Sequence, residues 1–174
     1  MKSKVINFAL FQAAWFGCVL SAAKGYWWMP PICAVFVCAA YLLMREDMIA
    51  NVRTLAIIVV IGTVIDLVLW RAKIVGFAQP QANFISIAAW FASLWASFAT
   101  TLRLSMSWLR SRYVVSAIFG AIGGPLAYLA GERLGALILP SKTLSLIVLA
   151  GEWAVLTPLV MWVAFRDDRK ESVA

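Results

Sequence analysis

The chain has 174 residues, of which 64% are hydrophobic and only 13% charged, and its formal net charge is +7. A soluble domain of this size could not bury so much apolar surface in one core, so the composition excludes a water-soluble globular protein. The sequence has no histidine and no glycine-rich phosphate motif, so we expect no catalytic residues, no cofactor and no metal.

Six apolar runs follow one another along the chain, at residues 6–23, 26–43, 54–70, 84–102, 114–138 and 144–165. Each approaches or exceeds the ~17–25 residues that a transmembrane helix needs, and none alternates as barrel strands do. The runs predict an all-α polytopic membrane protein: one domain of six transmembrane helices over residues 1–166, followed by a charged cytoplasmic tail at 167–174.

Lysine and arginine are distributed unevenly between the loops. Ten of the 15 lie in the N-terminus, the 44–53 and 103–112 loops and the C-terminal tail. Because successive helices cross the membrane in opposite directions, these four segments lie on the same side of it. The positive-inside rule therefore predicts that both termini are cytoplasmic. The same rule and the attraction to anionic lipid head groups explain the net charge, so we expect membrane lipids as partners and no nucleic acid.

Small residues recur at every fourth position in the first and fifth runs. They are Ala9, Ala13, Gly17 and Ser21 in the first run, and Gly120 and Gly124 in the fifth. Such a ladder lies on one helix face and lets another backbone approach closely. Internal packing of the bundle and docking of a second membrane protein, or of another copy of this chain, both remain open.

Two carboxylates fall within apolar runs. At 1.5 Å per residue, Asp66 lies roughly 18 Å above the cytoplasmic boundary and Glu152 about 12 Å below the outer one, so their depths coincide in a ~30 Å core. A charge there costs at least ~2.5–3.5 kcal/mol, so both side chains should face the interior or be protonated. Glu132, near the outer end of the fifth run, is expected to be interfacial and structural.

Tryptophans surround this level of the membrane. Trp90 and Trp153 share the depth of the carboxylates, while Gln12, Trp15 and Trp95 lie deeper. Tryptophans are common at the membrane interface, but that preference does not account for residues at this depth. We therefore predict an outward-facing ligand cavity. Its expected ligand-binding residues are Asp66, Glu152, Trp90, Trp95, Trp153, Gln12 and Trp15. The alternative is that each acid pairs with a neighbour and only fixes the bundle.

Four segments together resemble a known family. "FQAAWF" (11–16), "FATTL" (98–102), "SWL" (107–109) and "GAIGGPLAYLAG" (120–131), together with Asp66 in the third run, are similar to a bacterial domain-of-unknown-function family (2878) of short multi-spanning inner-membrane proteins. The resemblance implies a bacterial inner membrane, but it supplies no site residues because that family has no established activity.

A second likeness is architectural. Six helices and a ladder of small residues on the first look like the substrate-capture subunits of vitamin transporters. In those proteins the ladder docks a coupling subunit and the substrate binds near the outer face. Ala9, Ala13 and Gly17 are the matching positions.

Two functions are consistent with these features. The first is binding or passage of a small, partly apolar molecule or lipid in the cavity, with Asp66 as its polar anchor. The alternative is a non-catalytic structural subunit that positions a membrane partner through the ladders. The segments "NFALFQAAWF" (7–16) and "NFISIAAWF" (83–91) also leave open an inverted repeat of three helices and three.

Overall fold

The computed structural model describes residues 2–45, 48–77, 79 and 82–166, so the predicted tail at 167–174 lies outside the described residues. Within these ranges the chain forms six α-helices and no β-strand, which confirms the predicted fold class. The helices are α1 (Lys2–Ala23), α2 (Met29–Leu43), α3 (Met48–Arg71), α4 (Phe84–Leu102), α5 (Tyr113–Arg133) and α6 (Lys142–Ala164), with a short 3₁₀ helix, η1 (Ser107–Leu109), before α5.

Two helices are shorter than their apolar runs. Helix α2 has 15 residues, because Pro30 and Pro31 occupy its first turn and the aromatic residues before them form a turn. Helix α5 ends at Arg133 instead of continuing to residue 138. Gly135 there adopts a positive φ of 81°, and the Ala136 N–H bonds back to the Gly131 carbonyl at 3.0 Å.

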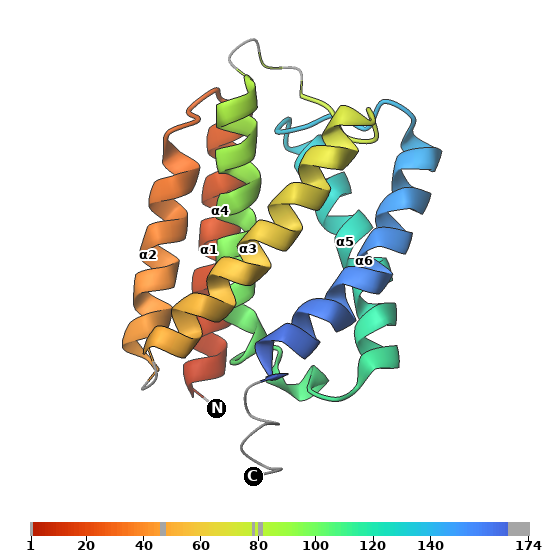
Figure 1. The fold of residues 1–174 in the computed structure, drawn as a ribbon. Helices are drawn as coiled ribbons and strands as arrows, with labels where there is room; N and C mark the ends of the chain where they lie inside the picture. The colour runs from red at the N-terminus through yellow and green to blue at the C-terminus, as the bar shows by residue number, and fades with distance from the viewer. Residues whose placement is uncertain (1, 46–47, 78, 80–81, 167–174) are drawn as a thin grey trace.

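The helices form two groups with α3 between them. Figure 1 shows α1, α2 and α4 side by side on the left and α5 paired with α6 on the right. Helix α3 crosses diagonally in front of α4 and reaches α6, so it links the two groups. The start of α1 and the end of α6 lie at the same end of the bundle.

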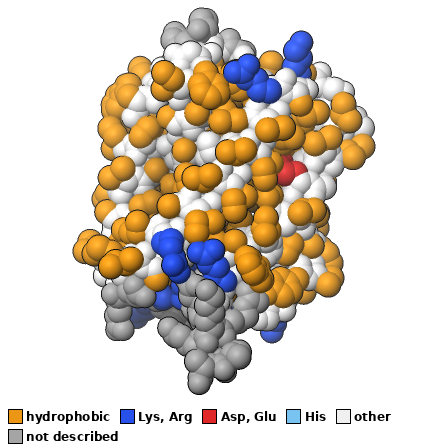
Figure 2. Space-filling view, viewed as in Figure 1, with side chains coloured by type: hydrophobic (Ala, Val, Ile, Leu, Met, Phe, Trp, Pro, Cys, Tyr) orange, Lys and Arg blue, Asp and Glu red, His pale blue; other side chains and the backbone are white. Residues whose placement is uncertain are grey.

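The surface has the distribution of side chains that a bilayer requires. In Figure 2 lysine and arginine lie near the two ends of the molecule, and the belt between them is almost entirely apolar, with one acidic side chain in it. Five of the helices, all except α2, are long and apolar enough to cross a membrane. The protein is therefore a multi-pass membrane protein.

Helix packing differs between the two halves of the chain. Helix α1 packs on α2, whereas α4 makes no close packing with α5 in the described structure. Conversely, α5 packs along α6, while α2 barely touches α3. An inverted repeat would place equivalent helices in equivalent contacts, so the two similar segments at 7–16 and 83–91 do not mark a repeated packing unit.

The loop before α4 and the loop before α6 join the two groups at the end of the bundle away from the start of α1. Gly76 and Ile138 exchange two backbone hydrogen bonds, of 2.9 and 2.8 Å. The Gln79 amide donates to the Gly135 carbonyl at 2.5 Å, and the Ser145 hydroxyl donates to the Ile74 carbonyl at 2.6 Å. These bonds connect the loops beside α5 and α6 to the loop after α3, in addition to the contacts that α3 and α4 make with α6.

Candidate functional site

A cavity of about 480 Å³ lies between the two groups of helices. It exists because α5 packs on α6 and not on α1, so α1 and α5 face each other across an unfilled space. Phe8 and Phe16 of α1 and Phe119 and Leu126 of α5 line it and are about half exposed, so they form its rim. The sequence predicted an opening toward the outer face; in the structure this rim lies along the sides of α1 and α5, where lipid would be.

Asp66 lies in the wall of the cavity and joins three helices. Its side chain is only 2% exposed. The Trp95 indole N–H of α4 donates to Oδ2 at 2.5 Å, and the Tyr128 hydroxyl of α5 donates to Oδ1. Both partners are neutral, and no lysine or arginine among the described residues forms an ion pair with the carboxylate. The Asp66 carboxyl group is therefore hydrogen-bonded on both oxygens but has no basic partner among the described residues.

Glycines bring the tryptophans to this position. Gly62 lies one helical turn before Asp66, and a methyl group on it would overlap the Trp95 indole. Gly124 gives the same room to Trp153, whose ring stacks on Trp95 with centroids 5.0 Å apart and an interplanar angle of 8°. Gly62 and Gly124 thus leave the space in which Trp95 and Trp153 stack beside the Asp66 carboxylate.

Glu152 of α6 lies beside this group but does not line the cavity. Both carboxylate oxygens are buried and have no hydrogen-bond partner among the described residues. Glu152 is close enough to interact electrostatically with both Asp66 and Tyr128. The equal depths inferred from the sequence thus correspond to two acids of α3 and α6 that lie near each other.

The structure brings six of the seven predicted ligand-binding residues to one cavity. Those residues are Asp66, Gln12, Trp15, Trp90, Trp95 and Trp153. Sequence reasoning missed Tyr128, which lines the same cavity. A signal was available, because a tyrosine within an apolar run needs a partner for its hydroxyl, and Asp66 was the acceptor at a comparable depth.

A protein-family model described as "Protein of unknown function (DUF2878)" matches residues 4–159. The chain belongs to the DUF2878 family. The match includes every cavity residue discussed above and confirms the resemblance found in the four sequence segments. No curated protein and no solved structure matches the chain. The likeness to vitamin-transporter subunits therefore stays a prediction.

The ladders of small residues lie in different surroundings in this DUF2878 protein. On α1, Ala9 and Ala13 are exposed, while Ser21 is buried. A methyl group on Gly17 would meet the Cys33 sulfur of α2 at 2.8 Å. On α5, both Gly120 and Gly124 are buried against Trp153 and Thr157 of α6. The glycines of α5 thus pack within the chain, and only the first half of the α1 ladder is an open face.

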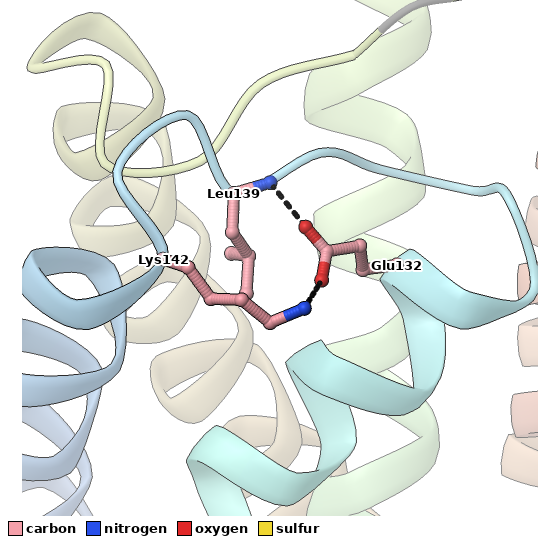
Figure 3. Close-up of polar contacts among 3 residues, drawn as sticks. All are labelled: Glu132, Leu139 and Lys142. Atoms are coloured by element: carbon pink, nitrogen blue, oxygen red, sulfur yellow. Dashed lines mark hydrogen bonds and ion pairs between the residues drawn. The ribbon is translucent and has the colours of Figure 1, made fainter.

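Glu132 ends α5 and holds the loop that leads to α6. Figure 3 shows its carboxylate between the Lys142 ammonium group, 2.8 Å from Oε2, and the Leu139 N–H, which donates to Oε1 at 3.1 Å. The interfacial, structural role expected from the sequence fits these contacts, although the cation is Lys142 and not the neighbouring Arg133.

We expect the two partners of Glu132 to differ in importance. Lys142 is 60% exposed, so Lys142→Met should lower the free energy of unfolding by less than about 1 kcal/mol. Glu132→Ala should cost about 1 kcal/mol more, because the Leu139 N–H also loses its acceptor. Thermal unfolding of the purified variants in detergent measures the difference. Equal losses in both variants would mean that the ion pair is the only stabilising contact.

Proposed function

We propose that this DUF2878 protein binds a small, partly apolar molecule, lipids included, in the cavity between α1 and α5. The observation that carries the proposal is the cavity itself. Its volume of about 480 Å³ lies within the ~300–1,000 Å³ that is usual for small-molecule sites. Its lining is mostly apolar, with Asp66, Gln12, Tyr128, Thr101 and Thr157 as its polar side chains. This composition orients a ligand while burying most of its surface.

The rim supports entry from the bilayer. Phe8 and Phe16 on one side and Phe119 on the other are exposed where lipid tails would contact the helices. A molecule dissolved in the membrane could therefore reach Asp66 without crossing a polar surface. We propose a bacterial inner membrane because the family resemblance implies one. We propose that both termini are cytoplasmic because the excess of lysine and arginine lies at the end where α1 begins.

Filling the cavity tests this proposal. Gly123 lines the cavity, and a Cβ built on it has no heavy atom within 4 Å. We expect Gly123→Phe to fold normally and to lose at least about 90% of the bound molecule, because the phenyl ring occupies the ligand's space. Native mass spectrometry of protein extracted gently with its lipids measures the retained mass.

The matched control is Gly151→Phe. Gly151 is also open, with no heavy atom within 4 Å of an added Cβ, but it is exposed on α6 and does not line the cavity. This variant should retain the bound molecule. Wild-type protein that carries no small molecule, but co-purifies with a second membrane protein, would refute the proposal and favour a structural subunit.

A further inference from the structure

We infer that the molecule bound in the cavity is a lipophilic organic cation. This inference rests on the proposed binding function and adds the chemical class of the ligand. Three features of the cavity carry it: an acid without a basic partner, a wall rich in aromatic side chains, and a lining that contains neither lysine nor arginine.

The lining of the cavity contains one acidic side chain, Asp66, and no basic one. Asp66 accepts hydrogen bonds from Trp95 and Tyr128, but neither donor carries a positive charge. A bound cation would supply the missing countercharge in a medium of low dielectric constant, where an uncompensated charge is costly.

The walls are suited to a cation with an apolar body. Trp15, Trp90, Trp95 and Trp153 all line the cavity, together with phenyl rings from α1, α4 and α5. Aromatic faces attract a cation through the negative charge of their π-systems and simultaneously bury apolar surface. The stacked pair of Trp95 and Trp153 lies at the carboxylate itself, since Trp95 donates to Asp66.

Anionic molecules are disfavoured by the same arrangement. Phosphate and carboxylate groups are normally bound by arginine, lysine or clusters of backbone N–H groups. The lining of this cavity provides no such cation. An anionic head group would instead meet Asp66 and be repelled by it, so the phosphate of a lipid does not belong here.

Two probes of equal size and shape but opposite charge test the inference. Tetraphenylphosphonium and tetraphenylborate are titrated into the purified protein in a non-ionic detergent, with empty micelles as the blank, and tryptophan fluorescence is recorded. We expect the phosphonium cation to bind at least about 10-fold more tightly, because the Asp66 carboxylate attracts the cation and repels the borate.

Variants locate the charge effect. Asp66→Asn should weaken phosphonium binding by roughly 10- to 100-fold and should not weaken borate binding. Gly123→Phe should weaken the binding of both probes, since it fills the cavity. If Asp66→Asn fails to fold, the comparison of the two probes on wild-type protein still decides the question.

The possible failures can be told apart. Equal affinities for the two probes, or tighter binding of tetraphenylborate, would overturn the cation inference. The proposed function would still be supported if native mass spectrometry finds a molecule bound to the wild type that Gly123→Phe has lost. Absence of binding by either probe also overturns the inference. The proposed function itself would be refuted only if, in addition, the wild-type protein carries no small molecule after gentle extraction.

Discussion

Replacing Gly62 with leucine is expected to lower the free energy of unfolding by about 3 kcal/mol or more. Leucine favours a helix over glycine by up to ~1 kcal/mol, but even its Cβ would overlap the Trp95 indole. The ring cannot move aside easily, because its N–H is bonded to Asp66 and its face is stacked on Trp153. Overpacking usually costs ~1–3 kcal/mol and occasionally more. Because even the Cβ overlaps the ring, we expect a strain above that range, of roughly 4 kcal/mol, which leaves about 3 kcal/mol after the gain in helix propensity.

Thermal unfolding followed by size-exclusion chromatography in detergent measures this loss. For a chain of this length ~3 kcal/mol corresponds to a fall of roughly 6–12 °C in Tm. Gly151→Leu is the control, because Gly151 is exposed and an added Cβ meets nothing within 4 Å. It should leave Tm unchanged or raise it slightly. If Gly62→Leu behaves like this control, α3 and α4 do not pack through Trp95 as described.

Replacing Asp66 with alanine should destabilise the protein by about 3–5 kcal/mol. The change leaves the buried Trp95 N–H and the Tyr128 hydroxyl without an acceptor, at ~1–3 kcal/mol for each group. Removal of a buried charge does not cancel this loss. Because α3 remains in the bilayer when the helices separate, the cost of a carboxyl group in lipid is common to the folded and the unfolded state.

A double-mutant cycle with Tyr128→Phe isolates the contact. Tyr128→Phe removes one donor to the carboxylate, so it should cost less in the Asp66→Ala background than in the wild type, by about 1–2 kcal/mol. Asp66→Asn keeps one carbonyl oxygen as an acceptor and should lose about half as much stability as Asp66→Ala. Additive losses in the cycle would contradict a direct bond between Asp66 and Tyr128.

The number and order of the helices could be predicted from the sequence, because the thickness of the bilayer fixes the length of an apolar run. The errors lie where apolar residues are not helical. Residues 136 and 137 are buried in the loop after Gly135. Because they are apolar, the predicted fifth helix included them and was too long. Tyr26 and the two tryptophans after it extended the second, although Pro30 and Pro31 mark the position where a helix begins.

The depth of the site was also predictable, since each helical residue advances by ~1.5 Å. Asp66, Trp90 and Trp153 fall at similar levels, and the structure brings them together with the deeper Trp95. The lateral rim of the cavity was not predictable, because it depends on which helices pack. The small residues of α5 indicated a close neighbour, but only the contacts with Trp153 and Thr157 identify that neighbour as α6 instead of α1.

The bonds of Asp66 have a consequence for biosynthesis. The chain is made from its N-terminus, so α3 enters the membrane before the helices that carry the two donors to the carboxylate. Trp95 follows Asp66 by 29 residues and Tyr128 by 62. Throughout that interval the acid has neither bond, yet α3 must still insert. Helix α3 is also the most apolar of the five long helices, and this surplus of isoleucine, valine and leucine offsets the ~2.5–3.5 kcal/mol that one acid costs at insertion.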